Sequence, residues 1–230
     1  MSRFLQLMRW ETILLHRNNL LGISLLVTTM YLALFQLLKL LGYRELFAML
    51  LVLNDPALIG FLFVSITILF EKESGSYSAL RVAPSSLHRY LGSKLVVLAL
   101  LGTACGWVMA VALLGPGIHH GMFLVTCFLI TLMFGSLGVA MVARVKRFVD
   151  LMLPMAGALV VMVLPMAEWF GLFRVPLKWL FPMEHGIRLL AWSFRYEVVA
   201  FPWLSLVVFL LSNAGMYAWG YWRFRRHNQG

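Results

Sequence analysis

Two strongly apolar blocks of this chain are separated by one long polar stretch, Phe70-Glu71-Lys72-Glu73-Ser74-Gly75-Ser76-Tyr77-Ser78-Ala79-Leu80-Arg81-Val82-Ala83-Pro84-Ser85-Ser86-Leu87-His88-Arg89-Tyr90-Leu91-Gly92-Ser93-Lys94. Tyr77, Leu80 and Arg81 fall at positions i, i+3 and i+4, so their spacing predicts a short amphipathic helix over residues 75–82. Pro84 ends this helix, because the residue before a proline is pushed out of the helical region. We interpret the stretch as a docking element held at a membrane surface.

The composition is typical of a membrane protein. Of the 230 residues, 62% are hydrophobic and 12% are charged, whereas a soluble domain is about half apolar and about a quarter charged. The net charge of +10 comes from short basic clusters between apolar runs. That pattern indicates contact with anionic lipid headgroups rather than with nucleic acid. We therefore predict an all-α integral membrane protein that contacts lipid and has no nucleic-acid partner.

The apolar blocks predict one transmembrane domain over residues 1–230, with an N-terminal amphipathic interfacial helix and six transmembrane helices. A helix of about 20 apolar residues crosses the roughly 30 Å of hydrocarbon in a bilayer. The last predicted span is preceded by an external region that contains a re-entrant or interfacial helix. The predicted segments are the interfacial helix at 2–19, spans at 20–38, 46–70, 91–114, 122–143, 151–169 and 202–222, a cytoplasmic coupling region at 71–90, and the external region at 170–200.

Asp55 interrupts the second apolar block. A charge at the middle of a bilayer costs about 2.5–3.5 kcal/mol on insertion scales, so we expect Asp55 near the outer interface. There it would cap a helix that begins at Pro56. Residues 46–53 would then form a shallow re-entrant helix, and residues 56–70 the main crossing. A proton or cation site at Asp55 is the alternative interpretation.

Two local patterns predict contacts rather than chemistry. Gly135 and Gly138 of the fourth span are small enough to let helix backbones approach closely, so they mark a packing surface. Glu184 is one helical turn from Arg188, and this spacing favours an ion pair over general acid–base work together with His185.

The distribution of basic residues predicts the orientation. If both termini lie on one side of the membrane, that side also holds all but six of the 19 Lys and Arg residues. Loops rich in Lys and Arg stay in the cytoplasm, so both termini and the polar stretch are expected to be cytoplasmic. The six basic residues expected on the opposite side are Lys39, Arg44, Arg174, Lys178, Arg188 and Arg195.

The chain shows no motif for using chemical energy by itself. It contains no Gly-x-x-x-x-Gly-Lys-Ser/Thr phosphate loop, no Gly-x-Ser-x-Gly motif and no His-Glu-x-x-His motif. A membrane protein with an elaborate docking element and no such motif indicates that a partner supplies the energy.

Three parts of the polar stretch resemble a known signature. Glu71-Lys72-Glu73-Ser74-Gly75-Ser76, Leu80-Arg81-Val82-Ala83-Pro84 and Tyr90-Leu91-Gly92-Ser93-Lys94 are similar to the run E-x-E-x-G-(T/S), L-x-x-(T/A/S)-P and Y-L-x-(S/A/G)-K. That run follows the second span in permeases of ABC-2 type exporters. The segment Asp55-Pro56-Ala57-Leu58-Ile59-Gly60 also resembles small six-span members, including fluoroquinolone-type drug export permeases.

The resemblance implies the ABC-2, type V-like exporter permease fold, with a cytoplasmic coupling helix at 74–82 between the second and third spans. This helix would sit in a groove of a separate nucleotide-binding ATPase subunit, which would bind ATP and Mg²⁺. The present chain would be a transport subunit, not an enzyme, and would bind no cofactor or metal itself. The residues implied in coupling to the ATPase are Glu71, Glu73, Ser74, Gly75, Ser76, Tyr77, Leu80 and Arg81.

Six spans are too few to enclose a substrate route in this family, so the resemblance also implies a second copy or a similar permease chain. The route would run between the two subunits, lined by parts of the second and fifth spans. An interior rich in aromatic and Met side chains suits an apolar or amphipathic cargo. The candidate lining residues are Phe61, Phe63, Thr67, Met162 and Met166.

The resulting hypothesis is a permease subunit of an ATP-driven ABC-2 type exporter in the bacterial cytoplasmic (inner) membrane. One alternative is a haem-export permease of cytochrome c maturation, against which the Glu-x-Glu-x-Gly run weighs. A second is an intramembrane enzyme that uses His185, Glu184 or Asp55. A third is a purely structural assembly subunit.

Overall fold

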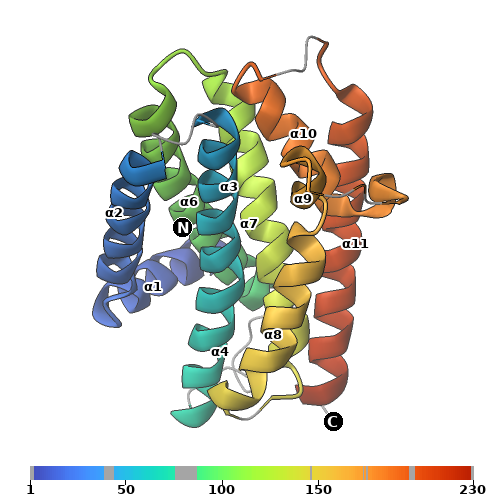
Figure 1. The fold of residues 1–230 in the computed structure, drawn as a ribbon. Coiled ribbons are helices and arrows are strands. Elements are labelled where there is room, and N and C mark those ends of the chain that lie inside the picture. Colours follow the sequence, from blue (N-terminus) through green and yellow to red (C-terminus); the bar gives the residue numbers. More distant parts are fainter. Residues whose placement is uncertain are drawn as a thin grey trace.

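The computed structural model describes residues 3–38, 44–75, 87–145, 147–172, 174, 176–196 and 200–228, which form helices and connections and no strand (Figure 1). The predicted all-α class is therefore confirmed for this part of the chain. The helices are α1 (Arg3–Arg17), α2 (Leu20–Leu38), α3 (Arg44–Leu58), a π-helical turn (Ile59–Phe63), α4 (Val64–Glu73), α6 (Leu87–Leu114), α7 (His120–Val142), α8 (Phe148–Val163), α9 (Met166–Trp169), a 3₁₀ turn (Lys178–Leu180), α10 (Pro182–Ser193) and α11 (Trp203–Asn228).

By length and composition, four helices of the described part can cross a membrane, namely Phe47–Glu73, Leu87–Leu114, His120–Val142 and Trp203–His227. Helices α1 and α2 would add a fifth span if they were counted as one, but they are bent by 66°. The bend lies at Asn19, whose φ of 57° is a left-handed conformation that Asn tolerates. Six spans, and an interfacial position for α1, stay predictions.

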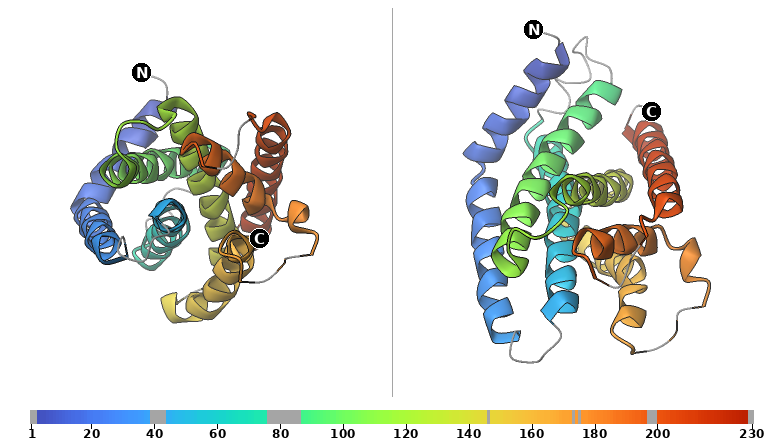
Figure 2. Two further views of the ribbon diagram at one scale, coloured as in Figure 1. Left: turned by 45° about the horizontal axis from the view of Figure 1, so that its top comes forward. Right: turned by 90° about the horizontal axis from the view of Figure 1, so that it is seen from above.

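Helix α7 lies at the centre of the bundle. It packs against α6, α11, α10 and the helix formed by α3, the π turn and α4. Its buried residues lie on all sides, which is the pattern of a helix surrounded by protein rather than by solvent. Helices α1 and α2 line one flank of the bundle and α11 the opposite flank (Figure 2).

Close backbone contacts hold the π turn and α11 against α7. A Cβ atom on Gly60 would lie 2.4 Å from the Thr131 carbonyl oxygen, and one on Gly138 would lie 2.9 Å from the Phe61 carbonyl oxygen. On the other side, a Cβ atom on Gly220 of α11 would lie 2.7 Å from the Ser136 carbonyl oxygen. The packing surface predicted on this helix is therefore confirmed.

Asp55 does not cap a helix, and the prediction that it does so is wrong. Helix α3 continues from Arg44 to Leu58 with Pro56 in its interior, and Phe47–Glu73 is one candidate span of 27 residues. The separate re-entrant segment at 46–53 is wrong for the same reason. Asp55 is fully buried, and Thr28 Oγ1 of α2 donates a hydrogen bond of 3.2 Å to Asp55 Oδ2. The carboxylate is therefore bound by a neighbouring helix, and its position relative to the membrane interface stays a prediction.

A helix is present in the region expected to be external. Helix α8 ends at Val163, Pro165 precedes the short helix α9, and α10 follows at Pro182–Ser193. The position of α10 relative to the membrane stays a prediction.

We expect the substitution Gly60→Ala to destabilise the bundle, because the new methyl group would meet the backbone of α7 at 2.4 Å. Overpacking of this kind typically costs about 1–3 kcal/mol. The measurement is the free energy of unfolding of the detergent-purified chain in a denaturant titration. Gly157→Ala in α8 is the control: no atom of its surroundings lies within 4 Å, so it should leave stability unchanged or raise it slightly. Equal effects of the two substitutions would contradict the close contact.

Candidate functional site

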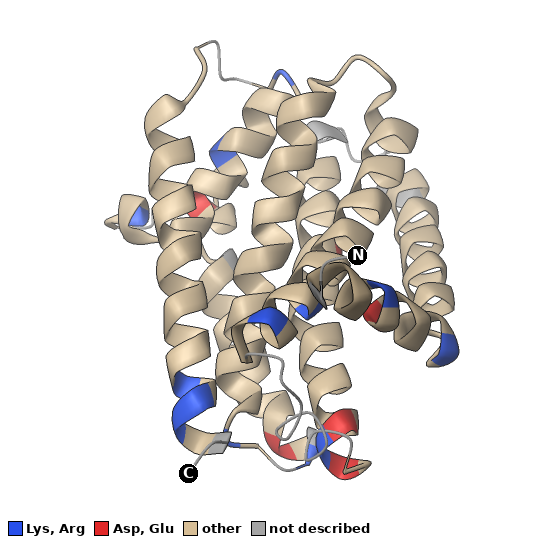
Figure 3. Ribbon diagram, turned by 180° about the vertical axis from the view of Figure 1, so that it is seen from behind, with Lys and Arg blue, Asp and Glu red and all other residues tan. Residues whose placement is uncertain are grey.

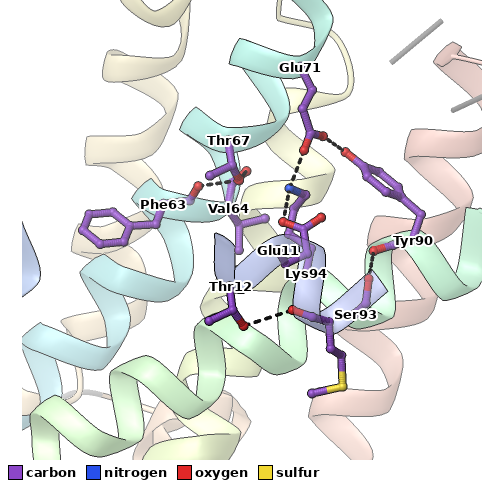
Figure 4. A network of polar contacts seen from close by, with 10 residues as sticks. Glu11, Thr12, Phe63, Val64, Thr67, Glu71, Tyr90, Ser93 and Lys94 are labelled. Carbon is purple, nitrogen blue, oxygen red and sulfur yellow. Dashed lines mark hydrogen bonds and ion pairs between the residues drawn. The ribbon is translucent and has the colours of Figure 1, made fainter. Parts of the chain in front are cut away.

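A buried ion network joins α1, α4 and α6 at the end of the bundle where α4 ends. Lys94 Nζ of α6 lies 2.8 Å from Glu11 Oε2 of α1 and 2.9 Å from Glu71 Oε1 of α4 (Figure 4). The Tyr90 hydroxyl, one turn before Lys94, donates a hydrogen bond to Glu71 Oε2. Each of the three helices therefore contributes one charged side chain to a single cluster.

Burial makes this network sensitive to the loss of any member. The Lys94 side chain is 1% exposed, and those of Glu11 and Glu71 are 6% and 12% exposed. Removing charges from water is costly, and a buried charge is tolerated only when it is paired and hydrogen-bonded. Here one ammonium faces two carboxylates, so the network carries a surplus of negative charge.

Lys72, the residue of α4 that follows Glu71, contacts α7 and α11. Lys72 Nζ donates to the carbonyl oxygens of Val142, at 2.9 Å, and Ala143, at 3.4 Å. These carbonyls are at the carboxyl end of α7, where helix carbonyls lack intrahelical partners and the helix dipole favours a cation. The same ammonium lies 5.4 Å from the centre of the Phe224 ring of α11. Through Glu71 and Lys72, the end of α4 contacts α6, α7 and α11, and Lys94 of α6 links it to Glu11 of α1.

The residues implied in coupling are only partly within the described structure. Glu71 belongs to the ion network, whereas Glu73 and Ser74 are exposed at the end of α4. Gly75 follows with a φ of 71° and open space around it. The predicted coupling helix beyond this point lies outside the described residues, as do Ser76, Tyr77, Leu80 and Arg81.

Two members of the network, Glu11 and Lys94, were not among the predicted site residues. Lys94 belongs to the quoted Tyr-Leu-x-x-Lys run, and Tyr90 and Lys94 are four residues apart on one helix. Residues at this spacing share a helix face, so the run itself was the available signal for Lys94. Glu11 carried no such signal, because its partner is 83 residues away.

The structure places the predicted lining residues of the route in three different surroundings. Phe61, Met162 and Met166 belong to one apolar cluster of the bundle, and Phe63 belongs to another. Thr67 lies on the wall of a cleft between α1 and α4, and its hydroxyl donates to the Phe63 carbonyl oxygen at 2.7 Å. Their role in a route between two subunits stays a prediction.

Glu184 and His185, two of the residues named in the enzyme hypothesis, bind groups of α10 itself and of the segments around it. Arg188 Nε donates to Glu184 Oε1 at 2.9 Å, so the predicted ion pair is confirmed. Trp169 Nε1 donates to the second oxygen of Glu184 at 3.2 Å. The ring nitrogens of His185 lie 3.3 Å from Ser205 Oγ and 3.1 Å from the Trp179 carbonyl oxygen.

Long apolar helices around a central α7 define a multi-pass membrane protein. The chain matches the model of the ABC-2 type transporter family over residues 2–194 and belongs to this family, which is a family of transporter permeases. The resemblance drawn from the polar stretch is therefore confirmed.

Two similar proteins come from Mycobacterium tuberculosis, strains CDC 1551 / Oshkosh and ATCC 25618 / H37Rv, and both are named fluoroquinolones export permease proteins. Each is 28% identical to this chain over 155 residues, which is 65% of this chain and 63% of the relative. The match thus spans less than two thirds of each relative's length.

We expect Lys94→Met to destabilise the protein by about 3–5 kcal/mol, because it leaves two carboxylates buried without a counter-charge. Adding Glu11→Gln and Glu71→Gln to the same chain should recover most of this loss. The control is Lys178→Met, which breaks a pair with Glu168 whose side chains are 25% and 26% exposed. Water reaches this half-buried pair, and pairs that water reaches contribute about 1 kcal/mol or less. Unfolding titrations of the purified variants measure the difference, and a Lys94→Met effect no larger than the control would contradict the network.

Proposed function

We propose that this chain is the permease subunit of an ATP-driven exporter, powered by a separate ABC-type ATPase that binds ATP and Mg²⁺. The observation that carries the proposal is the attachment of the end of α4 to α6, α7 and α11, and through Lys94 to α1. This end leads directly into the stretch that resembles the coupling helix of ABC-2 permeases. Motion imposed on that stretch by an ATPase would reach three helices through Glu71 and Lys72, and α1 through Lys94.

The physical basis of this transmission is the rigidity of buried ionic contacts. A salt bridge in a medium of low dielectric constant is lost at high cost when its partners separate, so the joined helices move together. Rigid-body motion of packed elements is a common form of switching between conformations. The ATPase would thereby change the access of the transport route from the inside to the outside.

The cargo that we propose is an apolar or amphipathic compound, for which the names of the mycobacterial relatives give one example. The route would lie between this chain and a second copy or a similar permease, and the chain itself would bind no cofactor or metal.

We place the protein in the bacterial cytoplasmic membrane with both termini inside. Support comes from the basic residues of α11, because Arg225 and Arg226 lie in its last turn next to the C-terminus (Figure 3), and from Lys72 in the last turn of α4. Basic residues beside spans favour the cytoplasmic side.

The coupling role predicts a contact between an ABC-type ATPase and the end of α4. A Ser74→Cys variant, treated with a bifunctional thiol cross-linker in its native membranes, should yield a product that contains an ABC ATPase by mass spectrometry. The control is Gly117→Cys in the exposed turn at the far end of α6, which should yield none. Background is low, because Cys105 and Cys127 are both buried. Purification of a complex that contains no ATPase, with no cross-link at Ser74, would overturn the proposal.

The orientation predicts which of these cysteines reacts in intact cells. A membrane-impermeant maleimide should label Gly117→Cys in intact cells, and Ser74→Cys only after the cells are opened, because the two positions lie at opposite ends of the bundle (Figure 1). The reverse pattern would place both termini outside.

A further inference from the structure

A cleft of about 770 Å³ opens between α1 and α4, beside the ion network. One wall is a single face of α1, represented by Leu7, Trp10 and Leu14, whose spacing of three and four residues is that of a helix face. The other wall is the last two turns of α4, represented by Phe70 and Glu73. Helix α1 packs on α6 and α2, so its face toward α4 borders this space.

The dimensions and the aromatic walls of the cleft suit a small molecule. Ligand pockets typically measure about 300–1,000 Å³ and combine apolar walls with a few polar groups. Trp10 and Phe70 are 55% and 51% exposed, so about half of each residue is not covered by the chain. A second hollow of about 260 Å³ lies along Ile66, Leu69, Phe70 and Glu73. Phe70 and Glu73 therefore stand between two hollows.

The charge of the cleft is opposite to that of the whole protein. Its walls include the carboxylates of Glu11, Glu71 and Glu73 and the guanidinium of Arg17. The Lys94 ammonium lies between Glu11 and Glu71 and is 1% exposed, so it adds one buried positive charge. Three negative charges against two positive ones leave an acidic cleft on a chain whose net charge is +10. Glu73 forms no ion pair within the described part of the chain.

We propose that this cleft binds an amphipathic cation, in which a protonated amine or similar centre is attached to an aromatic body. The aromatic body lies between Trp10 and Phe70, and the charged centre lies near Glu73. A cation over an aromatic ring gains additional electrostatic attraction. If the proposed export function holds, the cleft is an entry site at the cytoplasmic leaflet, next to the contacts that join α4 to α1 and α6.

Tetraphenylphosphonium and tetraphenylborate test the proposal, because they have nearly the same size and shape but opposite charges. The full-length chain is placed in phosphatidylcholine nanodiscs without any ATPase, and binding is measured by equilibrium dialysis against empty nanodiscs. The cation should bind saturably and the anion should not. Glu73→Gln should weaken binding of the cation about fivefold, the equivalent of about 1 kcal/mol. Trp10→Ala should weaken it by a similar factor.

The control is Asp150→Asn, which removes an exposed carboxylate in the first turn of α8, outside the cleft, and should leave binding unchanged. Equal binding of the two ions, or binding of the cation that neither Glu73→Gln nor Trp10→Ala weakens, would overturn the proposal. An equal loss with Asp150→Asn would also overturn it, because the attraction would then be that of the surface as a whole. No ATPase takes part, so failure here is distinct from failure of the proposed coupling.

Discussion

The arrangement of α1, α4 and α6 depends on the burial of one ammonium group. Lys94 is 1% exposed and lies within 2.9 Å of carboxylates from two other helices. A lone charge in such a place would be unstable, and Lys94 is the only member of the network that pairs with both carboxylates. Its pair with Glu11, in addition to apolar packing, thus fixes how the N-terminal helix meets the rest of the bundle.

The helix that runs from α3 through the π turn to α4 packs against both α6 and α7. In its last turn, Glu71 binds α6, and Lys72 contacts α7 and α11. Further along, the absence of a side chain at Gly60 lets its backbone touch that of α7. One helix is therefore attached by charge at its end and by close packing at its middle. In the proposed exporter, this combination would transmit motion from the end of α4 to the rest of the bundle.

Local patterns in the sequence were sufficient where both partners lie within one turn, as for Glu184 and Arg188, or where small size alone marks a contact surface, as for the glycines of α7. They failed where the partner is distant along the chain. Asp-Pro is typical of a helix start, yet α3 continues through Pro56, and Asp55 is hydrogen-bonded by Thr28, 27 residues earlier. Likewise Glu71 was predicted as a site residue from its motif, whereas Glu11 has no sequence pattern that reveals its distant partner, Lys94.

The burial of Asp55 has a consequence for the way the protein is made. Asp55 Oδ1 has no hydrogen-bond partner in the described part of the chain, and Oδ2 relies on Thr28 of the preceding helix. A segment that carries a carboxyl group enters lipid less readily when it enters alone. Helices α2 and α3 should therefore leave the translocon as a hairpin, with the first shielding the acid of the second during synthesis.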